Sequence, residues 1–113
     1  MFTSKHTLML FLIASEPGIK SVYDMVRIFD RADFPAMVRE NLDTLLNEKL
    51  IVISKYFENG HPMEYEITEN GRVYLKDNLD PKELIRCIQK MDNPTFIEEI
   101  TLAYLKKWGN ELL

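Results

Sequence analysis

Hydrophobic residues follow two different spacings in the first thirty residues of the chain. Residues 5–15 are apolar on nearly every side, and a Glu-Pro-Gly turn ends this stretch. The pattern predicts a short, buried helix. From Ser21 onward the apolar side chains recur every three or four positions, and Asp24 follows Ser21 with a spacing close to that of a capping box. A second, amphipathic helix is therefore predicted from Ser21 to about residue 30.

A third helix is predicted from about Phe34 to Lys49. Asp33 is a suitable N-cap. Pro35 suits the first turn, because the N–H that proline lacks would have no hydrogen-bond partner within the helix at that position. The face expected to be buried holds Met37, Val38, Leu42, Leu45 and Leu46. The residues expected to face outward are Ala36, Arg39, Glu40, Asp43 and Asn47.

A strand-like pattern replaces the helical spacing after the third helix. Residues 50–58 are β-branched and aromatic, and residues 63–68 alternate apolar with charged side chains. The Asn59-Gly60 pair between them is a strong signal for a hairpin turn. We therefore predict two antiparallel strands, with Phe57 in the core.

Thr68 marks the return to helical spacing. Its hydroxyl is expected to cap a fourth helix by accepting from amides of the first turn. Gly71 is expected at a point where a side chain would collide with a neighbouring element. Two further helices are predicted, at 81–91 and about 95–113, because the Asp-Asn-Pro turn between them cannot continue a helix.

These elements predict a mainly helical fold with a small β-hairpin (α+β). The stretch LDTLLNEKLIVISKYFENGHPMEYEITENGRVYL, residues 42–75, resembles the winged helix of small bacterial transcriptional regulators of the PadR-like and MarR-like kind. The resemblance covers roughly residues 4–78. It implies a winged helix-turn-helix in residues 1–80 and a C-terminal helical extension in residues 81–113, within one compact domain. Lys49 departs from the family pattern, in which glycine usually ends the third helix.

The resemblance also implies how the chain would meet DNA. In such proteins the third helix enters the major groove and the hairpin wing reaches phosphate or the minor groove. The residues that this implies as DNA contacts are Ser21, Arg31, Pro35, Ala36, Arg39, Glu40, Asp43, Lys55, Asn59, Gly60 and His61. Two of them have ordinary structural alternatives, because Arg39 is also placed to pair with Asp43 on a helix surface and His61 is also a plain turn residue.

The distribution of charge opposes DNA binding. The formal net charge is −4. Residues 1–80 hold nine lysine and arginine residues against thirteen aspartate and glutamate residues, so the excess falls on the expected DNA-binding part. Cations favour phosphate contacts through counterion release, and carboxylates oppose them. A winged-helix module that binds a protein instead of DNA is therefore the alternative function.

The last helix has a wider apolar arc than a helix resting on one surface needs. Regulators of this build usually pair through terminal helices, which implies a homodimer. The interface residues expected are Phe96, Ile97, Ile100, Tyr104, Trp108 and Leu112, with Trp108 as the anchor. The alternative is a monomer whose tail folds back on its own domain.

Several functional classes lack support in the sequence. Cys87 is the single cysteine, so no internal disulfide forms and a reducing, cytoplasmic setting is expected. His6, His61 and Cys87 are isolated, and neither a phosphate loop nor a nucleophile elbow is present. We therefore expect no enzymatic activity, no metal and no cofactor.

The longest apolar run, residues 8–14, is too short to span a membrane. Any small-molecule effector would be expected between the last helices and the wing domain.

Overall fold

The computed structural model describes the chain from Phe2 to Leu112, with side chains as far as Gly109. This part of the chain is mainly helical with one small antiparallel hairpin. The elements in chain order are α1 (Ser4–Ala14), α2 (Val22–Ala32), α3 (Val38–Asn47), β1 (Ile51–Tyr56), β2 (Pro62–Ile67), α4 (Glu69–Asn78), α5 (Pro81–Gln89) and α6 (Thr95–Leu112). Helices, a hairpin and further helices in this order are compatible with a winged helix.

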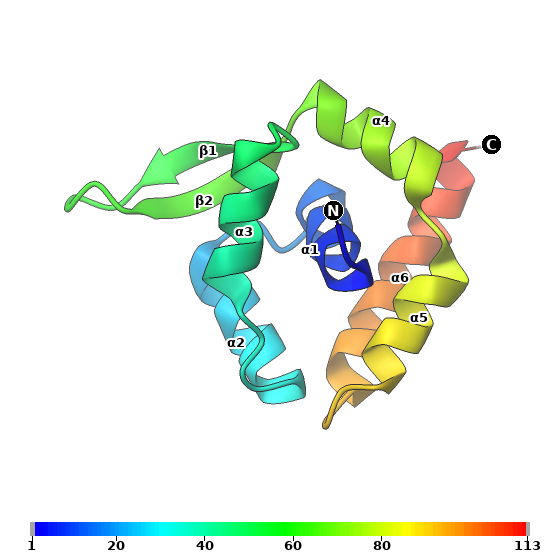
Figure 1. The fold of residues 1–113 in the computed structure, drawn as a ribbon. Helices are drawn as coiled ribbons and strands as arrows, with labels where there is room; N and C mark the ends of the chain where they lie inside the picture. Colours follow the sequence, from blue (N-terminus) through cyan, green and yellow to red (C-terminus); the bar gives the residue numbers. More distant parts are fainter. Residues whose placement is uncertain (1, 113) are drawn as a thin grey trace.

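The first helix lies at the centre of the molecule. In Figure 1, α2 and α3 lie on one side of α1, α5 and α6 lie on the other, and the hairpin projects away from the helices. Every side chain from Leu8 to Ile13 is fully buried, which confirms the helix predicted from the apolar stretch. Because α1 has a neighbour on every side, its sequence shows no polar face.

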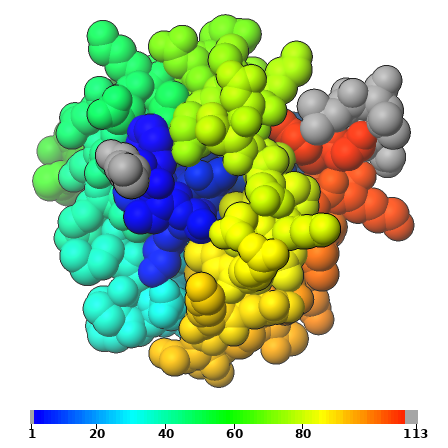
Figure 2. Space-filling model, turned by 45° about the vertical axis from the view of Figure 1, so that its right-hand side comes forward, coloured from blue at the N-terminus to red at the C-terminus, as the bar shows by residue number. Residues whose placement is uncertain are grey.

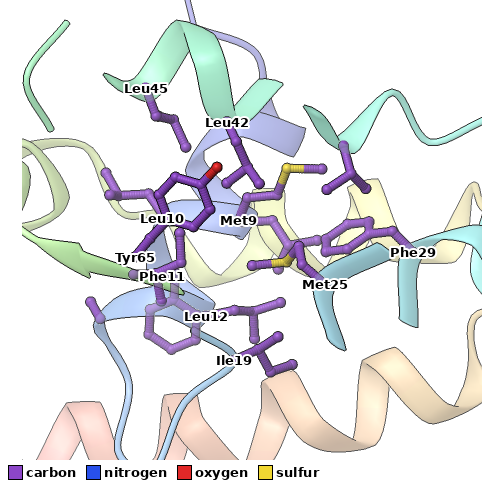
Figure 3. Close-up of a cluster of buried hydrophobic side chains, with 14 of the residues drawn as sticks. Met9, Leu10, Phe11, Leu12, Ile19, Met25, Phe29, Leu42, Leu45 and Tyr65 are labelled. Carbon is purple, nitrogen blue, oxygen red and sulfur yellow. The ribbon is translucent and has the colours of Figure 1, made fainter. Parts of the chain in front are cut away.

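The hydrophobic core forms around α1. Figure 3 shows Met9, Leu10, Phe11 and Leu12 of α1 together with side chains from α2, α3 and β2. The neighbours labelled there are Ile19, Met25, Phe29, Leu42, Leu45 and Tyr65. The amphipathic helices α2 and α3 thus turn their apolar faces to the same central helix, as their spacing predicted.

The hairpin is attached to the helices through the segment before α2. The backbone N–H of Tyr65 donates to the carbonyl of Lys20 at 2.8 Å, and Ser21 forms an isolated antiparallel bridge with Glu64. No pattern in the sequence predicted this pairing. It fixes the middle of β2 against the helical body, while the tip of the hairpin remains exposed.

Thr68 connects the hairpin, the end of α3 and α4. Its hydroxyl accepts from the N–H of Gly71 at 3.0 Å and donates to the carbonyl of Lys49 at 2.7 Å. A Cβ at Gly71 would collide with the carbonyl oxygen of Leu50 and lie 2.6 Å from Cγ1 of Ile67. The predicted cap and the predicted close approach are both confirmed.

The start of the third helix was predicted wrongly. The helix begins at Val38, and residues 33–37 form a connection in which Met37 has a left-handed φ of 54°. Asp33 is the C-cap residue of α2, and its carboxylate accepts from the ammonium of Lys5 at 2.6 Å. Helical spacing does not apply in such a connection. Ala36, predicted to face outward, is 1% exposed, while Met37, predicted to be buried, is 52% exposed.

The prediction that Phe57 lies in the core is wrong. Its side chain is exposed near the hairpin tip, because the hairpin projects beyond the helices there.

Within the part of the chain that the structure describes, no helix has both the length and the apolar character that a membrane crossing requires.

Candidate nucleic-acid interface

The outer face of α3 is open to solvent. Arg39, Glu40 and Asp43 are exposed along it, whereas Val38, Leu42 and Leu45 are buried on the opposite face. This division follows from the helical period, because residues three and four apart share one face. Figure 1 shows the hairpin extending beside this helix. An exposed helix and a projecting hairpin thus lie next to each other.

Charges on α3 act on a buried tyrosine of β2, Tyr65. Burial raises the pKa of the Tyr65 hydroxyl, the nearby carboxylate of Asp43 raises it further, and the cation of Arg39 opposes the rise. These surroundings favour the protonated phenol, which can donate a hydrogen bond. The alternation of residues 63–68 predicted only an apolar strand position for Tyr65. Its spacing alone gave no sign of its place beside α3.

Arg39 is not held by the ion pair that its sequence position allowed. Among the described residues, no contact within 4.0 Å joins Arg39 to Asp43 or to another carboxylate. Its guanidinium is therefore available to a ligand at this face. The surrounding charges are mostly negative, since Glu40, Asp43 and Glu48 are also exposed on or just after α3.

Apolar side chains stand at the entrance to α3. Phe34 is 73% exposed, and Met37 is exposed as well. Apolar contacts of this kind suit the methyl group of thymine or an apolar side chain of a protein. The sequence could not identify these two residues as surface residues, because large apolar side chains beside a helix are normally read as core. Pro35 is exposed in the same connection, and the burial of Ala36 removes it from the predicted contact surface.

The hairpin tip is built by its own hydrogen bonds. The N–H of His61 donates to Oδ1 of Asn59 at 3.0 Å, and the N–H of Gly60 donates to the carbonyl of Phe57 at 2.9 Å. Gly60 has a φ of 87°, which favours glycine. Asn59, Gly60 and His61 are exposed together at this tip. Lys55 is also exposed, but its ammonium lies 3.4 Å from the carboxylate of Glu64 on the other strand, which partly neutralises it.

The remaining predicted contacts lie at the two ends of α2. Ser21 caps the helix start, where its hydroxyl accepts from the N–H of Asp24 at 3.0 Å. Arg31 is exposed in the last turn, and its carbonyl accepts from Nδ2 of Asn93 at 3.3 Å. The latter contact places Arg31 beside the turn between α5 and α6. Arg39, Glu40 and Asp43 therefore lie together on the outer face of α3. The residues of the hairpin tip form a separate exposed group, and Arg31 lies beside the turn between α5 and α6.

The apolar stripe predicted as a dimer interface packs largely within the chain. Ile97 is 1% exposed, the Trp108 and Phe11 ring centroids lie 5.7 Å apart, and the Tyr104 hydroxyl accepts from the N–H of Gly18 at 3.2 Å. Ile97 has no surface left for a partner, so its assignment to the interface is wrong. Ile100 is half-buried, and Phe96 is exposed. The side chain of Leu112 lies outside the described residues.

An open pocket of about 480 Å³ lies between the start of α1, the connection before α3, and α5. In Figure 2 the blue residues at the start of α1 lie between the cyan and green α2–α3 region and the yellow α5. The pocket is lined by the Lys5–Asp33 ion pair, by Asn41 of α3 and by Cys87. Burial raises the pKa of the Cys87 thiol, which keeps it protonated and weakly nucleophilic at neutral pH. This is the region in which an effector was expected.

Comparisons with protein-family models, with curated proteins and with solved structures found no match to this chain. Across the described residues, no group of three or more histidine, cysteine, aspartate or glutamate side chains is arranged to hold a metal ion. The functional assignment therefore rests on the surface formed by α3 and the hairpin.

Proposed function

We propose that this chain is a dimeric winged-helix transcriptional regulator that binds duplex DNA. In this proposal α3 enters the major groove, where Arg39, Glu40 and Asp43 face base edges. The hairpin tip, with Asn59 and His61, reaches the sugar-phosphate backbone. The observation that carries the proposal is the exposed outer face of α3 beside a projecting hairpin.

The roles of the α3 side chains follow from their chemistry. Arg39 can donate two hydrogen bonds to guanine, and the carboxylates of Glu40 and Asp43 can accept from the amino group of cytosine. Because carboxylates repel the flanking phosphates, we expect affinity to depend strongly on the few available cations. Dimer formation compensates for this, since two half-sites bound together multiply the affinity of each.

Gel-shift titrations with duplex DNA test the proposal. We expect a shift at low salt that weakens steeply as salt rises, because bound counterions are released on binding. The Arg39→Ala substitution is expected to weaken binding by about 1–3 kcal/mol if the arginine contacts a base edge. Arg72→Ala is the matched control, because Arg72 is an exposed arginine on α4 and not on α3.

A second candidate function follows from the acidic surroundings of Arg39. In this reading the face formed by Glu40, Asp43 and Glu48 docks a basic segment of another protein. The same titration separates the two functions. No shift at low salt, together with identical behaviour of the Arg39→Ala variant and the unmodified protein, would support protein docking and reject DNA binding.

A further inference from the structure

One flank of α6, next to its buried face, carries residues placed symmetrically about Leu102. Leu102 is 48% exposed, although it is apolar. Glu98 lies four residues before it and Lys106 four residues after it. Thr95 and Gly109 lie seven residues before and after. Residues spaced by four and seven share one face of a helix, so these five residues form a single stripe. We call it the Leu102 stripe.

The Leu102 stripe borders an apolar groove between α5 and α6. The groove has a volume of about 640 Å³, and Ile85, Leu102 and Leu105 line it. Lys82 and Lys106 stand at its edge. Arg86 lines it too, but its guanidinium is paired with the carboxylate of Glu83 one helical turn away. An exposed apolar groove of this kind marks a surface that another molecule covers.

Opposite charges lie at the two ends of this surface. α5 and α6 pack against each other and are joined by a short turn, so their chain directions are opposed. Lys82 near the start of α5 therefore lies toward the same end as Lys106, whereas Glu98 and Glu99 lie toward the other end. Among the described residues, neither Lys82 nor Lys106 has a carboxylate within 4.0 Å.

A two-fold axis through Leu102 makes the surface complementary to itself. When two copies of α6 pack antiparallel, a residue four positions after Leu102 meets the residue four positions before it on the partner. Lys106 then faces Glu98 of the partner subunit, and this pair forms twice. Leu102 meets its own copy at the centre. The small side chains at 95 and 109 let the helix ends approach.

We propose that a second copy of this chain docks on this face, with the two α6 helices antiparallel about Leu102. A parallel arrangement would bring Lys106 onto its own copy, which like-charge repulsion disfavours. The inference rests on the dimeric function proposed above and replaces the apolar stripe expected from the sequence. In each copy α3 lies on the opposite side of α1 from α5 and α6 (Figure 1). The outer face of α3 therefore remains exposed in both copies of such a dimer.

Charge reversal across the two-fold axis tests the inference. Sedimentation velocity at micromolar concentration is expected to give a mass twice the 13.3 kDa of one chain. Either Lys106→Glu or Glu98→Lys places like charges opposite each other, and each is expected to raise the dimer dissociation constant by about tenfold or more. The double variant with both substitutions exchanges the charges and is expected to restore the dimer.

Lys107→Glu is the matched control. It makes the same change in charge one residue along α6, where the ammonium donates to the carbonyl of Glu16 instead of lying in the Leu102 stripe. This variant is expected to remain dimeric. Circular dichroism of every variant confirms that the helices are intact.

Three results would overturn the inference. These are a monomeric mass for the unmodified protein, an undisturbed dimer in the Lys106→Glu variant, and no recovery in the double variant. The measurement contains no DNA, so it is independent of the gel shift. A dimer that fails to bind DNA rejects DNA binding and leaves this inference standing. A monomer that binds DNA through Arg39 rejects the dimer in both proposals and leaves the DNA contact standing.

Discussion

Gly71 allows three elements to meet at one point. The end of α3, the end of β2 and the start of α4 come together there, and Thr68 connects them through its backbone and side chain. The carbonyl of Leu50 occupies the space in which a side chain at position 71 would lie. This carbonyl already accepts from the N–H of Thr68 at 3.0 Å, so it cannot turn away without losing that bond.

The Gly71→Ala substitution is expected to destabilise the protein by about 1–3 kcal/mol, because the added methyl group forces the backbone of Leu50 to move. Urea denaturation followed by circular dichroism measures the change. Asn70→Ala, at the exposed neighbouring position on the same helix, is expected to alter stability by less than about 0.5 kcal/mol. Equal stability of the two variants would contradict the proposed collision.

The end of α3 forms a Schellman motif with an unusual residue. The N–H of Leu50 donates to the carbonyl of Leu45 at 3.0 Å, and the N–H of Lys49 donates to the carbonyl of Leu46 at 3.0 Å. Lys49 has a left-handed φ of 61°. Glycine is the usual residue at such a position because it lacks the Cβ that makes this conformation costly. The helix therefore ends in a turn that normally takes glycine, with lysine in its place.

The Lys49→Gly substitution is expected to stabilise the protein by about 0.5–1 kcal/mol, since glycine relieves the left-handed conformation. The control is the same change at the preceding residue, because Glu48 has an ordinary φ of −85°. Glu48→Gly is expected to lower the unfolding free energy by about 0.5–1 kcal/mol. Chemical denaturation of both variants gives the comparison, and a loss of stability in Lys49→Gly would refute the backbone argument.

At the scale of the whole molecule, α1 joins the two halves of the fold. Its buried side chains contact α3 and β2 on one side, and α5 on the other. Leu84 and Ile88 of α5 and Ile97 of α6 are almost fully buried in the same cluster. Removal of the tail would therefore expose apolar surface of α1 to water, which costs roughly 25 cal/mol for each Å².

A fragment of residues 1–80 is accordingly expected to lack a cooperative unfolding transition, although the resemblance covers most of it. Urea titration followed by far-ultraviolet circular dichroism is the measurement, with the full chain as reference. A fragment that unfolds cooperatively near the midpoint of the full chain would show that α1 needs no cover from α5 and α6.

Local spacing was enough to predict the type and order of the elements. The apolar stretch of α1, the stripes of α2 and α3, and the Asn59-Gly60 turn each carry their signal within a few residues. The cap at Thr68 was predicted for the same reason, whereas the close approach at Gly71 depends on Leu50 and Ile67 from neighbouring elements. The connection at 33–37 was missed because Asp33 and Pro35 suit a helix start, while the contact that decides the role of Asp33 comes from Lys5.

Which segments become helices and strands could be predicted from the sequence alone, because those preferences depend on neighbours one or two turns away. Which apolar surfaces are covered depends on how the whole chain folds. The spacing predicted that Ile97, Tyr104 and Trp108 form a surface for a partner, yet α1 and the turn after it pack against this stripe. Leu102 remains exposed on another side. Burial depends on what else in the folded chain reaches a side chain, and residues distant in sequence settle that contact.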